Sequence, residues 1–290
     1  MEFTIRPATV SDLQGIHDCW LETDYPDAAQ RTAYAALGMA PWFPHLLTTG
    51  TLWIAVAGER IIGFAGTQTR GNVCYLSDCY THPTWQSRGV NAALLAALFD
   101  DSTHVRCTLA SSDPRALSRY VRAGMTPLFP SYMLRSTART RSQRPVFETR
   151  ACLDREEWLA HDTRFLGHDR RVDIDYFASE AACTLLQIFD GSQLVGQEVT
   201  NLRRYDLAPN GKRNLGPVAS IDRVSAAAVV QSALGWLMAD GATEVSMRLP
   251  GPHPALPILL AAGMQVAYAE TYCASAEWFD PQCYAPSGLM

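Results

Sequence analysis

Residues 74–100 read CYLSDCYTHPTWQSRGVNAALLAALFD, and the order of structural signals in this stretch decides the fold class. Its first part, 74–81, is short, rich in β-branched and aromatic residues and ends near a proline, as is typical of a strand. After a small-residue turn, Val90, Leu94 and Leu98 recur at helical spacing. A strand, a turn and a helix start expose several backbone N–H groups at the positive end of a helix. The stretch therefore predicts either a turn that binds a phosphate or pyrophosphate, or a purely structural connection.

The segments around this stretch alternate between strand and helix signals. Two apolar arms at 52–57 and 60–67 flank a turn glycine, which predicts a hairpin. Strands are also expected at 3–7, 105–110 and 125–134, and helices at 11–21, from Asp113 to Ala123, and at about 225–238. The alternation predicts an α/β fold.

A second segment, 113–125, reads DPRALSRYVRAGM. Together, the two segments resemble the signature of the GNAT (GCN5-related) N-acetyltransferases. In that family a Q/R-x-x-G-x-G/A loop opens a helix, and an N-x-x-A-x-x-x-Y-x-x-x-G-F segment follows. The residues that match are Gln86, Gly89, Ala116, Tyr120 and Gly124. The residues that depart from the pattern are Ser87, Asn91, Asp113 and Met125.

The resemblance implies direct transfer of an acetyl group from acetyl-CoA, used as a co-substrate without a metal, to an amine. The acceptor is a small molecule or a peptide. In this family the pantetheine arm pairs with the strand before the loop as an added strand would, and the loop holds the pyrophosphate. On that basis the expected cofactor-binding residues are Cys79, Tyr80, Thr81, Gln86, Ser87, Arg88, Gly89, Val90, Asn91, Asp113 and Ala116.

Two residues are candidates for proton transfer. Tyr120 matches the family's general acid, which protonates the departing thiolate; the alternative is an amphipathic-helix tyrosine with a buried ring. Asp78 is the candidate base, directly or through a water, and the alternative is a solvent-facing strand aspartate. Ser77 and Tyr80 are the other candidates for that role, since alternation puts Tyr80 on the face of Asp78. His82, beside the proline, is expected to be an exposed turn residue.

The composition sets limits on compartment and partners. The chain has 290 residues, of which 48% are hydrophobic, and a net charge of −5, which argues against nucleic acid as the main partner. Its 8 cysteines form no CxxC pair and no metal-binding spacing, so we expect reduced thiols. No apolar run approaches the roughly 20 residues that cross a bilayer, and no signal peptide opens the sequence. We expect a cytoplasmic protein with no membrane partner; its oligomeric state is open.

The second half repeats the first in outline. Residues 58–63 are similar in sequence to residues 191–196, and residues 116–125 are similar to residues 255–264. We therefore predict two tandem domains of GNAT type, 1–138 and 145–290, joined by a linker at 139–144. The helix entry at 221–225 contains no glycine, which predicts a degenerate second domain.

Two further details bear on the second half. Leu259 stands at the position equivalent to Tyr120. The segment Gly167–Arg170, with Gly216–Pro217 downstream, resembles the C-terminal halves of some bacterial tandem acetyltransferases. We expect the first domain to be the N-acetyltransferase. The alternatives are a non-catalytic acetyl-CoA sensor, which amine-dependent release of thiol would exclude, and a scaffold module that does not bind acetyl-CoA.

Overall fold

The structure is a computed structural model that describes residues 2–99, 103–136, 140, 144–179, 183–202, 207 and 211–287. The first half contains the elements β1 (Thr4–Pro7), η1 (Val10–Asp12), α1 (Leu13–Asp24), α2 (Ala28–Ala35), α3 (Trp42–Thr49), β2 (Thr51–Ala57), β3 (Arg60–Arg70), β4 (Val73–Thr81), η2 (Pro83–Trp85), α4 (Val90–Phe99), β5 (Val105–Ala110), α5 (Pro114–Arg122) and β6 (Thr126–Arg135). The second half contains β7 (Glu148–Ala151), α6 (Arg155–Leu166), α7 (Arg171–Ser179), β8 (Thr184–Asp190), β9 (Gln193–Leu202), β10 (Lys212–Ser220), α8 (Ala226–Ala239), β11 (Glu244–Pro250), α9 (Ala255–Ala261), β12 (Gln265–Ala274) and β13 (Tyr284–Ala285). The predicted α/β fold is confirmed.

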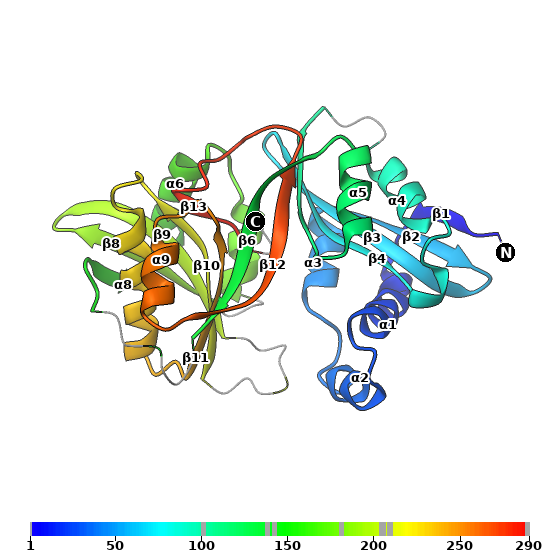
Figure 1. The fold of residues 1–290 in the computed structure, drawn as a ribbon, viewed down its shortest axis with the longest axis horizontal. Helices are drawn as coiled ribbons and strands as arrows, with labels where there is room; N and C mark the ends of the chain where they lie inside the picture. The colour runs from blue at the N-terminus through cyan, green and yellow to red at the C-terminus, as the bar shows by residue number, and fades with distance from the viewer. Residues whose placement is uncertain are drawn as a thin grey trace.

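The strands of the described residues form one mixed 13-stranded sheet in the order β1-β2-β3-β4-β5-β12-β6-β11-β10-β9-β8-β7, with β13 added beside β10. Each strand from β1 to β6 has a counterpart from β7 to β12. The order from one edge is β1-β2-β3-β4-β5-β12, and the order from the other edge is the equivalent β7-β8-β9-β10-β11-β6. The two halves are therefore related by a pseudo-twofold axis between β12 and β6. Figure 1 shows these two strands side by side between the two lobes.

Equivalent local details confirm the repeat. Gly58 and Gly191 both take left-handed conformations in their hairpin turns, with φ of 62° and 58°. The backbone N–H of Met125 donates to the carbonyl of Tyr120, and that of Met264 donates to Leu259 in the same way. A glycine with no Cβ adopts positive φ at little cost, which explains why the turn glycines recur.

The last strand of each half is exchanged with the other half. β6 follows α5 in the chain yet pairs with β11, from Arg135↔Ser246 to Ser131↔Pro250. β12 likewise pairs with β5, from Thr271↔Ala110 to Ala274↔Cys107. The sequence predicts where β6 lies in the chain but not its partner. Of the predicted linker at 139–144, residues 139 and 141–143 lie outside the described residues, so the exact domain boundary stays a prediction.

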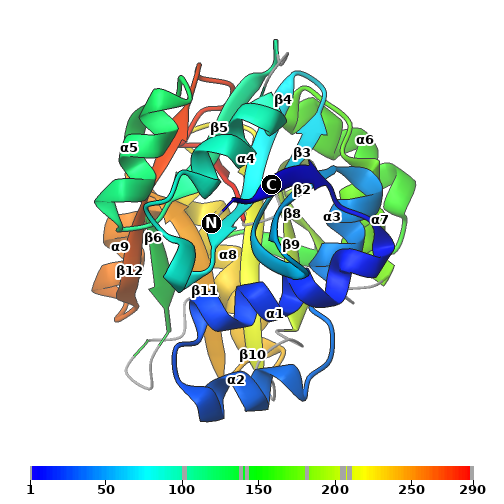
Figure 2. The same cartoon turned by 90° about the vertical axis from the view of Figure 1, so that its right-hand side faces the viewer.

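Apolar side chains cover both faces of the sheet in each half. In the first half, α4 packs on one face through Val90, Leu94 and Leu95, while α1 and α3 pack on the other. Figure 2 shows α4 and α5 on one side of β3 and β4, with α3 on the other. In the second half α8 and α9 cover one face, and α6 and α7 the other. Within the first half, the site opens where β4 and β5 meet.

A buried ionic cluster joins the halves on the α3 and α7 side. Asp173 of α7 accepts hydrogen bonds from Arg70 Nε at 2.6 Å and Arg70 Nη2 at 2.7 Å. His45 Nε2 lies 2.9 Å from the same carboxylate, and the His45 ring stacks on Tyr176. Burial raises the pKa of Asp173, but the hydrogen bonds from His45 and Arg70 outweigh it and hold the pKa below its usual value. Asp173 therefore stays ionised, and its contacts with Arg70 and His45 link the two halves.

Candidate functional site

The site opens where two parallel strands separate. β4 and β5 pair only from Val73↔Val105 to Leu76↔Thr108. Beyond that point β4 continues to Thr81, and a bulge at Ser77 shifts its register against β3. No described strand pairs with this edge of β4 after Leu76. Its backbone groups are therefore free to pair with an extended ligand.

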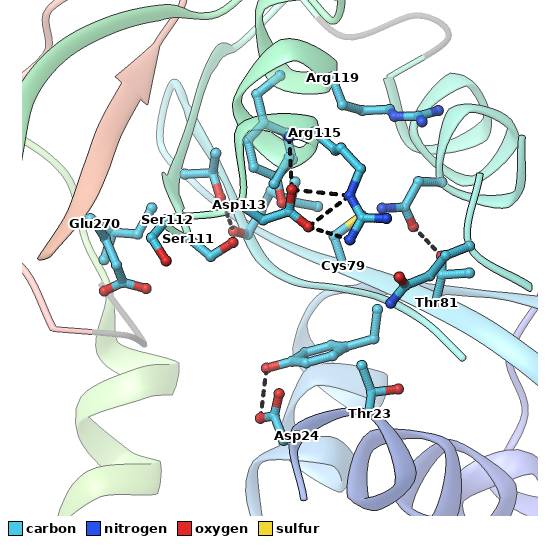
Figure 3. A pocket seen from close by; sticks show the side chains of 18 of the residues that line it. Thr23, Asp24, Cys79, Thr81, Ser111, Ser112, Asp113, Arg115, Arg119 and Glu270 are labelled. Carbon is cyan, nitrogen blue, oxygen red and sulfur yellow. Dashed lines mark hydrogen bonds and ion pairs between the residues drawn. The ribbon is translucent and has the colours of Figure 1, made fainter. Parts of the chain in front are cut away.

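A cavity of about 640 Å³ lies over this separation (Figure 3). The expected site residues that line it are Cys79, Tyr80, Thr81, Gln86, Ser87, Gly89, Val90, Asn91, Asp113, Ala116 and Tyr120. The structure thus brings both signature segments to one cavity. Two expected residues, Asp78 and Arg88, do not line it.

The loop before α4 is shaped by two left-handed residues. Gly89 has a φ of 85°, and Ser87 has a φ of 61°, which is uncommon for a residue with a side chain. They carry the chain sharply from η2 into α4, whose first N–H groups have no partner within the helix. The Arg88 guanidinium lies over the Trp85 ring, 5.2 Å from its centroid.

Asn91, the departure from the family pattern, has a structural partner. The Thr81 hydroxyl donates to Asn91 Oδ1 at 2.5 Å (Figure 3). This bond ties the end of β4 to the first turn of α4. The side chain therefore fixes the width of the opening between strand and helix.

Asp78 is buried directly behind the cavity wall. Its side chain accepts a hydrogen bond of 2.7 Å from the Ser77 hydroxyl, and Ser77 lines the cavity. Burial raises the pKa of Asp78 to about 6, and the nearby charge of Asp24 adds to the rise. The predicted base is thus not solvent-facing, and Ser77 connects it to the cavity.

Tyr120 is buried at the cavity wall, with 7% of its surface exposed. Its hydroxyl lies close enough to the Cys79 thiol for each group to affect the pKa of the other. Burial raises the pKa of Tyr120 well above its usual value, so the hydroxyl stays protonated. Burial also raises the pKa of Cys79 to about 12, so its thiol is not a nucleophile at neutral pH.

Two arginines on α5 line the cavity and were not predicted. Arg115 donates to Asp113, whose carboxylate also accepts from the Arg115 backbone N–H and caps the helix. Arg119 lies one turn further on and lines the same cavity, where its charge acts to lower the pKa of Cys79 (Figure 3). Their spacing along one helical face was a usable signal, but arginine is abundant in this sequence and hides it.

Two carboxylates on other elements were also missed. Asp24, at the end of α1, accepts from Trp20 Nε1 at 2.8 Å and from the Tyr80 hydroxyl at 3.2 Å. Glu270 comes from β12 of the second half. Both line the cavity and are labelled in Figure 3. No local motif marks either of them.

His82 is not the exposed turn residue that the sequence suggested, because it is 8% exposed. Its Nδ1 accepts from the Thr84 backbone N–H at 3.2 Å, which caps η2. Its Nε2 lies 3.1 Å from the Glu22 carboxylate. These contacts give it a structural role.

Comparison with known proteins agrees with this geometry. Residues 14–125 match the family model described as the acetyltransferase (GNAT) family. Residues 14–125 form a GNAT domain. The match supports acyl transfer as the general activity of a GNAT domain. A search of curated proteins found no match by sequence.

Solved structures extend the comparison to the whole chain. A protein from Pyrococcus horikoshii, assigned as an acetyltransferase, aligns with a TM-score of 0.73 at 14% identity, over 99% of this chain and 95% of that one. A GCN5-related N-acetyltransferase from Sphaerobacter thermophilus aligns with a TM-score of 0.59 at 16% identity, over 94% and 95%. A tandem GNAT protein from the clavulanic acid biosynthesis pathway aligns with a TM-score of 0.61 at 13% identity, over 94% and 98%. At these identities the likeness shows a shared tandem GNAT fold.

The second GNAT-type half has the same strand separation, but a strand fills it. β10 pairs with β11 only as far as Leu215↔Met247. Past that point β13 pairs with β10 at Val218↔Ala285 and Ala219↔Tyr284. The position that is open beside β4 is therefore occupied beside β10 by the chain's own C-terminal segment.

None of the described helices has the length and apolar composition needed to cross a bilayer. Within the same residues, no cluster of three or more His, Cys, Asp or Glu side chains is arranged to hold a metal ion.

Proposed function

We propose that the first GNAT domain transfers the acetyl group of acetyl-CoA to an amine. The observation that carries the proposal is the free edge of β4 beyond Leu76, which opens into a cavity beside the left-handed turn before α4. An extended pantetheine arm can pair with this edge, and a pyrophosphate can accept hydrogen bonds from the turn and the first N–H groups of α4. Arg119 adds positive charge on the same side, next to the ion pair of Arg115 and Asp113.

In this proposal, side chains of the first half accept and donate the protons of the transfer. The amine nitrogen attacks the thioester carbonyl carbon, and the carbon–sulfur bond breaks. The proton that the nitrogen loses passes through the Ser77 hydroxyl to Asp78, because Ser77 lines the cavity and already donates to Asp78. Tyr120 gives a proton to the departing sulfur. Water then returns Asp78 and Tyr120 to their starting states.

The second half is proposed to bind no acetyl-CoA. The pairing of β13 with β10 supports this, since it uses the backbone edge that pantetheine would need. Leu259, at the position of Tyr120, is buried in an apolar cluster and has no proton to give. Calorimetry should give one acetyl-CoA site per chain, and a stoichiometry of two would contradict this division.

Release of free thiol from acetyl-CoA in the presence of candidate amines tests the proposal. Amine-dependent release separates an acetyltransferase from a sensor that only binds acetyl-CoA. Absence of binding by calorimetry would instead point to a scaffold module.

Tyr120→Phe tests the proposed acid. The ring and its packing remain, so the affinity for acetyl-CoA should change little, while kcat should fall by roughly 10²–10⁴-fold. Tyr132→Phe, on β6, is the matched control, because Tyr132 packs against the core of the second half and does not line the cavity. A kcat for Tyr120→Phe within threefold of the unmodified protein, measured where chemistry limits the rate, would reduce Tyr120 to a packing residue.

A further inference from the structure

The wall of the cavity that faces the proposed donor site belongs to the second half. Four residues from it line the cavity: Arg248 of β11, and Tyr268, Ala269 and Glu270 of β12. The exchange of β12 explains this. Thr271 pairs with Ala110, the last residue of β5, so Glu270 lies just past the end of β5, where the cavity opens.

One oxygen of the Glu270 carboxylate is bonded to Arg248, and the other can accept a hydrogen bond from a ligand. Its Oε2 accepts from Arg248 Nε at 2.7 Å, and the two side chains are only 16% and 18% exposed. Arg248 also donates to the Tyr268 hydroxyl at 3.3 Å. Within the described residues, Glu270 Oε1 accepts no hydrogen bond from the protein. Figure 3 shows the carboxylate at the edge of the open space, across from Asp24.

The cavity has opposite charges at its two ends. Arg115, paired with Asp113, and Arg119 lie on the side of the loop and α5, where the positive charge of Arg119 suits the phosphates of the donor. Around the other end are the carboxylates of Asp24 and of Glu270, the latter paired with Arg248, while Asp78 is buried behind the wall. Buried Tyr75 lines the cavity as well.

This polarity selects among amines. If Asp78 receives the proton of the reacting nitrogen, it does not bind a second charge. Asp24 and Glu270 remain, on different elements and different sides of the opening (Figure 3). An acceptor with its own carboxylate is repelled by Asp24 and gains no hydrogen bond from the Glu270 carboxylate. An acceptor with a second ammonium group gains a charge-assisted hydrogen bond in a partly desolvated site.

We propose that Glu270 is a specificity-determining residue that binds a second ammonium group of the acceptor. The acceptor is then a compact diamine or polyamine. This proposal rests on the proposed acetyl transfer and assigns the second half a role in the first half's reaction. It also gives a functional reason for exchanging β12, because the register of β12 with β5 brings Glu270 to this wall.

The test compares three series of acceptors of equal chain length. These are alkyl monoamines, α,ω-diamines from three to six carbons, and ω-amino carboxylic acids. We expect kcat/KM for the best diamine to exceed that of the matched monoamine by at least tenfold, and the amino acids to be poorest. Glu270→Gln should reduce the diamine preference to within threefold by raising KM for diamines. Its Kd for acetyl-CoA should not change.

Two controls separate recognition from folding. Glu270→Asp keeps the charge and should retain part of the preference. Glu148→Gln removes a glutamate that also pairs with an arginine, Arg150, but on β7 at the far edge of the sheet, and should retain all of it. A diamine preference that survives in Glu270→Gln overturns the proposal, as does equal use of monoamines and diamines by the unmodified protein. If no amine of any series releases thiol, acetyl transfer itself fails and the proposal falls with it.

Discussion

At the scale of single residues, the carboxylate of Asp78 is kept in an environment that opposes its charge. Burial raises its pKa to about 6, against a usual value of 3.8, and only the Ser77 hydroxyl compensates. A base that titrates near neutrality is well matched to proton transfer at physiological pH. The same shift costs stability, because the folded state holds the proton more tightly than the unfolded state does.

Asp78→Asn should therefore lower the activity and raise the stability of the folded protein. With the folded pKa raised, the contribution of Asp78 is fully present below about pH 4 and is lost as the pH rises through about 6. A shift of this size corresponds to roughly 3 kcal/mol at most. The variant should be more stable than the unmodified protein at pH 8, by up to that amount, and similar at pH 4.

The activity of the same variant provides the second readout. Loss of the base should lower kcat/KM by roughly 10²–10⁴-fold and remove the acid limb of its pH profile near 6. Denaturant unfolding at the two pH values measures the stability. Asp18→Asn, at an exposed position on α1, is the matched control. A variant that is less stable at pH 8, or that keeps the acid limb, contradicts the assignment of Asp78 as the base.

What the sequence predicts at this scale depends on whether a residue belongs to a local pattern. Gly89, Asn91 and Tyr120 lie at fixed positions within two short segments, and both segments line one cavity. Asp24 and Glu270 line it as well, but they reach it through the docking of α1 and the exchange of β12. Their place follows from tertiary pairing, which no local spacing records.

At the scale of elements, the turn from β4 into α4 combines backbone shape with charge. Gly89 has a φ of 85°, and a Cβ built on it meets no atom within 4 Å. An alanine there would be strained only by its backbone conformation, at roughly 1 kcal/mol. A charged side chain would also face the phosphates of the donor.

Gly89→Ala and Gly89→Asp should separate these two effects. We expect Gly89→Asp to weaken acetyl-CoA binding by at least tenfold, about 1.4 kcal/mol, and Gly89→Ala to weaken it less. Gly58→Asp is the matched control, because Gly58 also has positive φ and free space for a Cβ, but lies in the β2–β3 turn. Calorimetry on folded variants gives the three affinities. Equal affinities for all three would remove the turn from the pyrophosphate site.

Strand positions were well predicted at this scale, whereas strand partners were not. The segment 105–110 was expected as a strand and is β5 with those bounds. The strand expected at 125–134 is β6, at Thr126–Arg135, but its neighbours are β11 and β12. Apolar content and turn residues determine that a segment is extended, while the choice of neighbour depends on the whole sheet.

At the scale of the whole molecule, two features make the halves interdependent. The exchanged strands β6 and β12 give each half a strand that the other half supplies. The cluster of Arg70, His45 and Asp173 joins the halves a second time through buried charges. The sequence predicted two repeats, because the repeats share local patterns. The exchange has no local signal, and Asp173 was not singled out.

Asp173→Ala should show how strongly the cluster holds the halves together. The change leaves the Arg70 guanidinium buried at 6% exposure without its carboxylate. Removing one partner of a buried ion pair costs about 3–5 kcal/mol, because the remaining charge has neither water nor a counter-ion. Asp175→Ala, on the same helix, breaks a pair with Arg155 in which both side chains are more than 40% exposed, so it should cost at most about 1 kcal/mol.

The pH dependence of this difference gives an independent check. Because the folded pKa of Asp173 is lowered, its contribution to stability is present above the unfolded value, near 3.8, and is lost as the pH falls through the folded value. The gap between the unmodified protein and Asp173→Ala, measured by urea unfolding, should therefore be largest near neutral pH and shrink in acid. A gap no larger than that of Asp175→Ala at pH 7 would mean that the exchanged strands alone hold the halves together.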